Sequence, residues 1–481
     1  MKILKTIFPL SIILLLNACK TTKIAIPSPV FPIPSANQLA WHELETYAFI
    51  HFTTNTFTGK EWGFGDESPS LVDPNEMNVD QWVKTIKDAG LKAVILTCKH
   101  HDGFVLWPSK FTYHSIASSP YKNGKGDIVK EVSEACKKYN LKFGIYLSPW
   151  DRNRADYGSA SYLEYYRSQL KELFAAYGPI FEMWFDGANG GDGYYGGNIE
   201  KRKIDGKSYY NWPKTISMVR DLEPKILFFS DAGPDIRWVG NEKGLAGRTN
   251  WNSINKDTLF AGKASIEELL NSGNEYGKDW VPAEVDVSIR PGWFYHKEED
   301  NKVKSAEKLF EIYLTSVGRG SNLLLNIPPD RRGLIHENDV KSLLDWRKML
   351  EDKFKKNLAL DAKVDVSSNF NKNLKSQNII DGNTKTFWAS SIKDKNATIE
   401  LDLKKVQTIN FIEIQEFIAL GQRVQSFTIE VWKDENWMEI ASETTIGYKR
   451  ILKINPLNTQ KIRIKIKETK AEVVISEVKV W

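Results

Sequence analysis

The chain has 481 residues, of which 41% are hydrophobic and 12% aromatic. This length is more than one ordinary core needs, so we expect two domains. The 66 basic and 61 acidic residues leave a formal charge of +5, and they form no long basic block. The composition therefore argues against a nucleic-acid-binding protein.

The N-terminus has the pattern of a lipoprotein signal peptide over residues 1–18. Lys2 and Lys5 precede an apolar run over 7–16, which is shorter than the ~20 residues of a membrane-spanning helix. The run ends in Leu-Asn-Ala-Cys, which resembles the lipobox of bacterial lipoproteins. We expect an exported bacterial lipoprotein, periplasmic or at the cell surface, that a lipid on Cys19 anchors to a membrane. Residues 19–37 contain four prolines and predict an extended linker.

Residues 38–354 alternate between strand and helix patterns. Strands are predicted at 47–51, 93–98, 143–147, 181–185, 226–230, 281–288 and 322–327, and helices at 79–86, 127–139, 161–177, 212–222 and 305–317. This alternation indicates a parallel sheet, and about 300 residues of it favour a (β/α)₈ TIM-like barrel. No Gly-x-Gly-x-x-Gly follows the first strand, which argues against a dinucleotide-binding fold.

The composition changes between residues 355 and 362. Short strands with alternating apolar residues follow at 398–403, 408–413, 426–432, 451–454, 461–466 and 473–481, with no helical pattern between them. Many short strands separated by turn residues are typical of a β-sandwich. The α/β barrel is therefore expected to be followed by an all-β sandwich domain over 362–481.

Polar and aromatic residues follow the C-terminal ends of the predicted barrel strands, where barrels place their chemistry. Asp186 is the most conspicuous, because it ends the buried run 181–185 and precedes Gly187. The other candidates are His51, Glu61, Trp62, His100, His101, Tyr146, Trp184, Glu242, Glu284, Arg290 and Trp293.

This set of side chains suits a sugar, whose hydroxyl groups bind His, carboxylates, Arg and Tyr while its C–H faces contact Trp. No Gly-x-x-x-x-Gly-Lys-Ser/Thr motif indicates a phosphate site. His100 and His101 are adjacent and would point to opposite sides of an extended segment, so they would not readily share a metal ion. We therefore expect no catalytic metal and no catalytic cofactor.

Four segments together resemble the α-L-fucosidases of glycoside hydrolase family 29. They are Ile50-His51-Phe52 with Glu61-Trp62-Gly63, Lys99-His100-His101-Asp102-Gly103-Phe104, Trp184-Phe185-Asp186-Gly187, and residues 320–330 with the sequence GSNLLLNIPPD. The resemblance implies that Asp186 is the nucleophile, and that His51, Glu61, Trp62, His100, His101 and Tyr146 bind fucose.

The general acid/base is less directly implied. Trp238-Val239-Gly240-Asn241-Glu242 resembles the segment that carries it in the branch of the family that cleaves α-1,3 and α-1,4 linkages. The resemblance therefore assigns Glu242, and Glu284 at a predicted strand end is the second candidate. Trp184, Arg290 and Trp293 complete the expected substrate-binding set.

The C-terminal part is similar to discoidin-like, family 32 carbohydrate-binding modules, through Ile379-Ile380-Asp381-Gly382-Asn383-Thr384 and Trp388. Such modules often hold a structural calcium ion, which the sequence does not place. A sugar-binding role and a purely structural role both remain open for this domain.

The resemblance implies a retaining exo-glycosidase that releases α-L-fucose from fucosylated oligosaccharides or glycoconjugates by double displacement. Two alternatives remain open from the residues. One is another exo-glycosidase on the same barrel, such as a galactosidase. The other is a lipid-anchored glycan-binding protein without activity.

Overall fold

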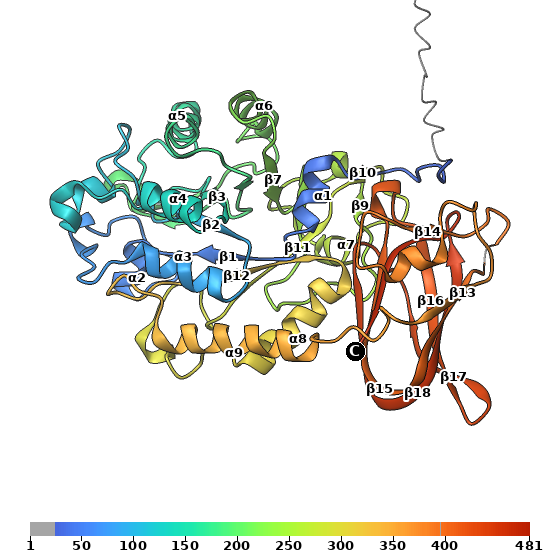
Figure 1. Ribbon diagram of the computed structural model, residues 1–481. Helices are drawn as coiled ribbons and strands as arrows, with labels where there is room; N and C mark the ends of the chain where they lie inside the picture. Colours follow the sequence, from blue (N-terminus) through green and yellow to red (C-terminus); the bar gives the residue numbers. More distant parts are fainter. Residues whose placement is uncertain (1–24, 395) are drawn as a thin grey trace, which may run out of the picture.

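The computed structural model describes residues 25–394 and 396–481. The expected signal peptide and the expected lipidation site Cys19 lie outside these residues. Within them, no helix is both long and apolar enough to cross a membrane. The chain forms a barrel, blue to yellow in Figure 1, beside a β domain in orange and red.

Eight parallel strands form a closed barrel, which confirms the predicted fold class. The last strand pairs with the first, so that Leu323 lies opposite Thr46. In their order around the barrel the strands are β1 (Thr46–Ile50), β2 (Ala93–Lys99), β3 (Lys142–Leu147), β4 (Glu182–Trp184), β7 (Leu227–Ser230), β8 (Ile236–Trp238), β11 (Ala283–Ser288) and β12 (Asn322–Asn326).

The sequence patterns predicted seven of these strands and missed β8. This strand has three residues, and its central residue, Arg237, is fully buried. The Arg237 guanidinium donates hydrogen bonds to three backbone carbonyl groups and to the side chain of Asn250. Because arginine is rarely fully buried, the pattern Ile-Arg-Trp does not indicate a buried strand.

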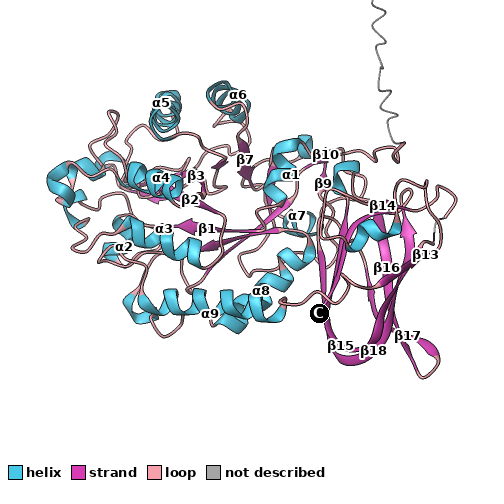
Figure 2. Ribbon diagram, viewed as in Figure 1, coloured by secondary structure: helices cyan, strands magenta, loops and turns pink. Residues whose placement is uncertain are grey.

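Helices cover the outside of the barrel (Figure 2). They are α1 (Ala36–His42), α2 (Thr54–Thr58), α3 (Val79–Asp88), α4 (Ile128–Lys138), α5 (Ala160–Tyr177), α6 (Trp212–Leu222), α7 (Glu267–Ser272), α8 (Ala306–Thr315) and α9 (Glu337–Lys353). The helix α1 begins at Ala36, two residues inside the predicted linker, because Ser35 and Gln38 form a capping box. Short two-stranded sheets pair β5 (Gly191–Gly193) with β6 (Glu200–Arg202), and β9 (Ser253–Ile254) with β10 (Asp279–Trp280).

Alternate residues of each barrel strand face the lumen and the helices. On β1, Tyr47 and Phe49 belong to the cluster inside the barrel, whereas Ala48 and Ile50 pack against the helical layer. Trp41 of α1 joins the inner cluster at the bottom of the barrel. The lumen is therefore filled between its two ends, and the side chains that follow the C-terminal ends of the strands line a cavity.

The C-terminal domain is an antiparallel all-β domain, as expected for a discoidin-like fold. Its strands are β13 (Lys363–Val366), β14 (Trp388–Ala389), β15 (Thr398–Glu416), β16 (Val424–Lys433), β17 (Asn436–Glu443), β18 (Arg450–Thr469) and β19 (Val474–Val480). The predicted strands 398–403 and 408–413 are one long strand, β15, whose register with β18 shifts between Asp402 and Gln407. Strands 451–454 and 461–466 likewise merge into β18, and β13, β14 and β17 were not predicted.

Polar contacts join the C-terminal domain to the barrel. The ammonium group of Lys449 is buried between Glu45 of the barrel, at 2.6 Å, and Glu413 of its own domain, at 3.7 Å. The segment before α1 also lies on this domain, since the Val30 amide donates to the Leu420 carbonyl at 2.9 Å. The two domains thus share a specific interface.

Candidate active site

A cavity of about 390 Å³ opens at the C-terminal ends of the barrel strands. It brings together most of the side chains that the sequence singled out from distant segments. Its lining residues are Phe49, His51, Trp62, His100, His101, Tyr146, Trp184, Asp186, Gly187, Ala188, Asp231, Trp238, Glu242, Asp286 and Trp293.

Asp186 follows strand β4 and points its carboxylate into this cavity. One oxygen accepts a hydrogen bond from the Tyr146 hydroxyl at 2.9 Å and the other from the Ala188 amide at 2.7 Å. The His101 ring nitrogen Nε2 lies 3.8 Å from the same carboxylate. Hydrogen bonds of this kind favour the ionised form of an acid and fix its direction.

Gly187 allows a second carboxylate to pack directly behind the first. A Cβ atom at this position would lie within 2.1 Å of the Asp231 carboxylate, so no other residue fits. Burial, together with the nearby charge of Asp186, raises the pKa of Asp231 to about 6. Asp231 accepts a hydrogen bond from the Gly262 amide at 2.7 Å.

Three histidines form one wall of the cavity. Burial lowers the pKa of His51 to about 3 and that of His101 to about 4, and it lowers the pKa of His100 well below its ordinary value. His51 bonds to Asn326 at 2.8 Å and His101 to Ser148 at 2.7 Å. All three rings are thus neutral at neutral pH, and each retains a nitrogen that can bond to a hydroxyl group.

Aromatic rings form the floor and the rim. Trp184 lies flat on Phe229, with ring centroids 4.0 Å apart, and its indole N–H points down into the barrel toward Glu284. Trp62 at the rim is 53% exposed, and Trp293 approaches His51 with a centroid distance of 5.3 Å. These faces offer apolar surface to a ligand whose hydroxyl groups would bond to the histidines.

Glu242 reaches the cavity from the loop after β8. Its carboxylate accepts a hydrogen bond from the Trp293 indole N–H at 3.3 Å. Partial desolvation of the carboxyl group raises the pKa of Glu242, and the negative charge of Asp186 raises it further. The site therefore holds one carboxylate fixed by two hydrogen bonds, Asp186, and a second carboxyl group whose pKa is raised, Glu242.

Asp286 is a further acid in the wall, and its role was not foreseen from the sequence. It accepts a hydrogen bond from the Trp238 indole N–H at 2.8 Å. Burial raises the pKa of Asp286 well above its ordinary value, as do the charges of Glu242 and Asp186. The available signal in the sequence was its position two residues after Glu284 on β11. Alternate residues of a strand share a face, so both acids point inward, but only Asp286 lines the cavity.

The structure corrects the assignment of Glu284 as second candidate for the acid/base. This residue is completely buried beneath the floor and does not line the cavity. It accepts hydrogen bonds from the Trp184 indole, at 2.8 Å, and from the Tyr47 hydroxyl. Burial raises the pKa of Glu284 well above its ordinary value, and the residue supports Trp184 from beneath the floor.

Arg290 and Glu61 are also displaced from the substrate-binding role that the sequence predicted. Arg290 is fully buried away from the cavity and pairs with Asp339 at 2.6 Å and Asp300 at 3.0 Å. Glu61 accepts hydrogen bonds from the Trp293 amide, at 2.7 Å, and from the His296 ring, at 2.5 Å. Glu61 thus supports the loop that presents Trp293 and does not line the cavity.

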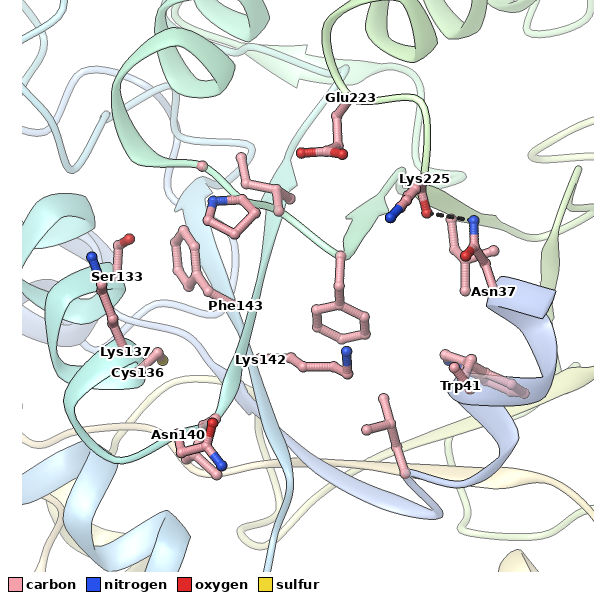
Figure 3. A pocket seen from close by; sticks show the side chains of 18 residues that line it. Asn37, Trp41, Ser133, Cys136, Lys137, Asn140, Lys142, Phe143, Glu223 and Lys225 are labelled. Atoms are coloured by element: carbon pink, nitrogen blue, oxygen red, sulfur yellow. Dashed lines mark hydrogen bonds between the residues drawn. The ribbon is translucent and has the colours of Figure 1, made fainter. Parts of the chain in front are cut away.

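A cavity of about 490 Å³ lies at the opposite end of the barrel, beside Trp41 and Phe143 (Figure 3). Its lining is largely apolar, and exposed lysines such as Lys137 and Lys225 stand at its edge. It contains one carboxylate, Glu223, and no pair of acids. The N-terminal end of a barrel contributes to stability rather than chemistry, so the smaller cavity is the candidate active site.

Comparisons with known proteins identify the families of both domains. The sequence family described as Alpha-L-fucosidase matches residues 29–353, and the F5/8 type C domain family matches residues 363–478. The chain is 40% identical to Alpha-L-fucosidase 1 of Arabidopsis thaliana, over 94% of this chain and 87% of that protein.

Solved structures of similar proteins share the whole fold. A glycoside hydrolase 29 family member from an unknown rumen bacterium is 42% identical with a TM-score of 0.86, over 94% of this chain and 78% of that one. A Ruminococcus gnavus GH29 fucosidase, solved in complex with fucose, is 32% identical with a TM-score of 0.85, over 96% and 97% of the two chains.

Proposed function

The chain belongs to the α-L-fucosidase family, glycoside hydrolase family 29, whose enzymes release fucose, and from this premise we propose a retaining mechanism with Asp186 as nucleophile and Glu242 as general acid/base. The observation that carries the proposal is the contrast between these two acids in one cavity. Asp186 accepts two hydrogen bonds, whereas desolvation raises the pKa of Glu242. Two carboxyl groups whose environments separate their pKa values are the usual signature of a nucleophile and an acid.

In the first step, an Asp186 oxygen forms a bond to the anomeric carbon of fucose. The bond from that carbon to the leaving oxygen breaks, and Glu242 transfers its proton to that oxygen. In the second step Glu242 removes a proton from water, whose oxygen displaces Asp186 from the sugar. Retention requires the two carboxyl groups to approach to about 5–5.5 Å around the substrate.

We propose that the neutral histidines and Tyr146 bind the hydroxyl groups of fucose, while Trp184 and Trp293 contact its apolar side. Neutral imidazole both donates and accepts, which suits the hydroxyl groups of an uncharged sugar. We further propose α-1,3 and α-1,4 linkages as substrates, because the segment Trp238–Glu242 resembles that of the corresponding branch. Release of fucose from Lewis-type but not α-1,2-linked oligosaccharides is the expected result.

The nucleophile is tested with Asp186→Asn and its neighbour Asp231→Asn as matched control. We expect Asp186→Asn to lose turnover of nitrophenyl fucoside and to regain it with azide, which replaces the missing nucleophile and leaves fucosyl azide of inverted configuration. Asp231→Asn should form no such product. Azide rescue in Asp231→Asn alone would transfer the role to Asp231.

We propose that the enzyme is an exported lipoprotein anchored through Cys19, on the basis of the lipobox pattern in the sequence. In cells, the wild-type protein should then fractionate with membranes and take up labelled fatty acid. Cys19→Ser should do neither. Membrane association of Cys19→Ser would contradict the anchor.

The C-terminal module is a candidate for the structural calcium that its family often holds. Within the described residues no three His, Cys, Asp or Glu side chains form a metal cluster, but the carboxylate of Glu477 is fully buried without a well-formed hydrogen bond. Burial raises the pKa of Glu477 to about 7, and the charge of Asp381 contributes. We propose that Glu477 and the turn at Asp381 would hold the ion. Calcium should raise the melting temperature of the wild type and not of Glu477→Gln.

A further inference from the structure

The residues that follow Glu242 in the chain are bound by the C-terminal module, and we propose that this contact positions Glu242 for proton transfer. We call residues 239–252 the acid/base loop. The inference rests on the proposed role of Glu242. It assigns to the module a part in catalysis that is independent of any sugar binding by that domain.

The middle of the acid/base loop has little support on its outer side. Glu242 faces the active-site cavity, while Lys243 and Leu245 line a cleft of about 950 Å³ between α8 and strands β17 and β18. Leu245 is 41% exposed. Because Glu242, Lys243 and Leu245 lie between these two hollows, their position depends on how the rest of the loop, in which Gly244, Ala246 and Asn250 are buried, is packed and bonded.

The barrel supplies one set of these bonds. Thr315, the last residue of helix α8, bonds to the loop twice. Its hydroxyl donates to the Gly244 carbonyl at 2.9 Å, and its carbonyl accepts from the Ala246 amide at 2.9 Å. These contacts hold the strand-proximal half of the loop against the barrel. The barrel also bonds to the second half of the loop, since the Asn250 side chain donates to the Arg319 carbonyl at 2.9 Å and to the Ser321 hydroxyl at 3.0 Å, and the module adds further bonds from Arg248 onward.

The module supplies the second set, centred on Gln422. The Gln422 side chain donates to the Asn250 carbonyl at 2.9 Å and accepts from the Asn252 amide at 2.9 Å and from the Asn252 side chain at 3.1 Å. The Thr445 hydroxyl accepts from the Asn250 amide at 2.9 Å. Gln422 is 5% exposed and Thr445 1% exposed, so water cannot readily replace these bonds.

A charged group completes the attachment at Arg248. The Arg450 guanidinium donates to the Arg248 carbonyl at 2.7 Å, and Arg248 in turn pairs with Glu443 at 2.9 Å. The module thus contacts the loop at Arg248, Asn250 and Asn252, starting six residues after Glu242. A displacement of about 1 Å in a catalytic group can reduce a rate about 10²-fold, so this attachment is close enough to affect proton transfer.

The test uses the full-length chain with Gln422→Met and Thr445→Val, singly and together, since both changes keep the shape of the side chain and remove its bonds to the loop. The matched control is Gln425→Met, because Gln425 is a module glutamine that bonds to Glu275 of the barrel, at 2.6 Å, outside the loop. The kcat/KM is measured with nitrophenyl fucoside and with a fucosyl oligosaccharide that the wild type cleaves. Only the oligosaccharide has a poor leaving group that needs the acid.

We expect the double variant to lose about 10-fold in kcat/KM on the oligosaccharide and less than about 2-fold on the nitrophenyl substrate. The alkaline limb of the pH profile should also shift, because Glu242 loses its fixed surroundings. Gln425→Met should change neither. If the double variant fails to fold, each single variant should show a smaller loss of kcat/KM that is again greater on the oligosaccharide than on nitrophenyl fucoside.

Equal losses on both substrates in folded variants would overturn the inference, since they would indicate general destabilisation. The same shift in Gln425→Met would overturn it as well. Glu242→Gln is run in parallel: if that variant shows no dependence on the leaving group, the acid/base assignment itself is wrong. If the loss of activity depends on the leaving group in Glu242→Gln but not in the module variants, only the proposed role of the module is overturned.

Discussion

Arg290→Met distinguishes a structural arginine from a substrate-binding one. The guanidinium is fully buried and donates to Asp339, which is itself fully buried, and to Asp300. Removing it leaves the Asp339 carboxylate in a buried site without its cation. Breaking a buried pair in this way costs about 3–5 kcal/mol, which corresponds to a fall of ~4–7 °C in melting temperature for a domain of the size of this barrel.

The loss should depend on pH with a definite sign. Burial already raises the pKa of Asp339 in the folded protein, and Arg290 opposes that rise. Without Arg290 the folded pKa rises further above the unfolded value, so the folded variant retains a proton that the unfolded chain releases. Its stability therefore falls as pH rises through this window, and the deficit should be smaller at pH 5 than at pH 8.

Thermal unfolding at the two pH values and kinetics on nitrophenyl fucoside at low temperature are the measurements. We expect KM within about 2-fold of wild type, because the guanidinium does not line the cavity. The double variant Arg290→Met/Asp339→Leu should recover much of the stability, since it removes the unpaired charge together with its partner. A large rise in KM with an unchanged melting temperature would refute the structural role.

Three further predictions concern acids and histidines of the site. Glu242→Gln should reduce kcat/KM on oligosaccharides by about 10²–10⁴-fold and leave kcat/KM on nitrophenyl fucoside nearly unchanged. The variant should also lose the decline in rate at high pH, because that decline reflects the deprotonation of Glu242, whose raised pKa places it at a higher pH than for an ordinary glutamate. Glu284→Gln should leave the ratio of rates on the two substrates unchanged, because the amide oxygen can still accept from Trp184; a selective loss on oligosaccharides would restore Glu284 as the acid. The NMR signals of the ring protons of His51, His100 and His101 should not titrate between pH 5 and 8. The stability of the fold should decrease as pH drops below about 6.5, because the unfolded chain binds protons there and the folded rings do not. Titration of these signals near pH 6.5 would show that the rings are accessible to water.

Periodicity was sufficient to predict the barrel, and a strand that ends in an acid followed by glycine was sufficient to locate Asp186. Both signals are local, because a buried strand must be apolar and its C-terminal end in a barrel faces the cavity. The strand β8 escaped this reasoning since Arg237 satisfies its charge with distant carbonyl groups, which no local pattern reveals.

The direction of a side chain at the rim is also not a local property. Arg290 and Glu61 lie close in sequence to the cavity wall but turn toward Asp339 and His296 respectively. Within β11, Glu284 and Asp286 both face inward, and their depth along the strand decides which one meets substrate. Depth follows from the register with neighbouring strands, here Glu284 opposite Asn322, and a single sequence does not supply it.

The pairing of β1 with β12 also has a consequence for biogenesis. Thr46 lies opposite Leu323, so the first strand gains its second neighbour only when nearly the whole catalytic domain is available. At ~5–20 residues per second of synthesis, that edge stays open for tens of seconds. An open strand edge invites intermolecular pairing, so the nascent chain is expected to depend on chaperones until the ring is complete.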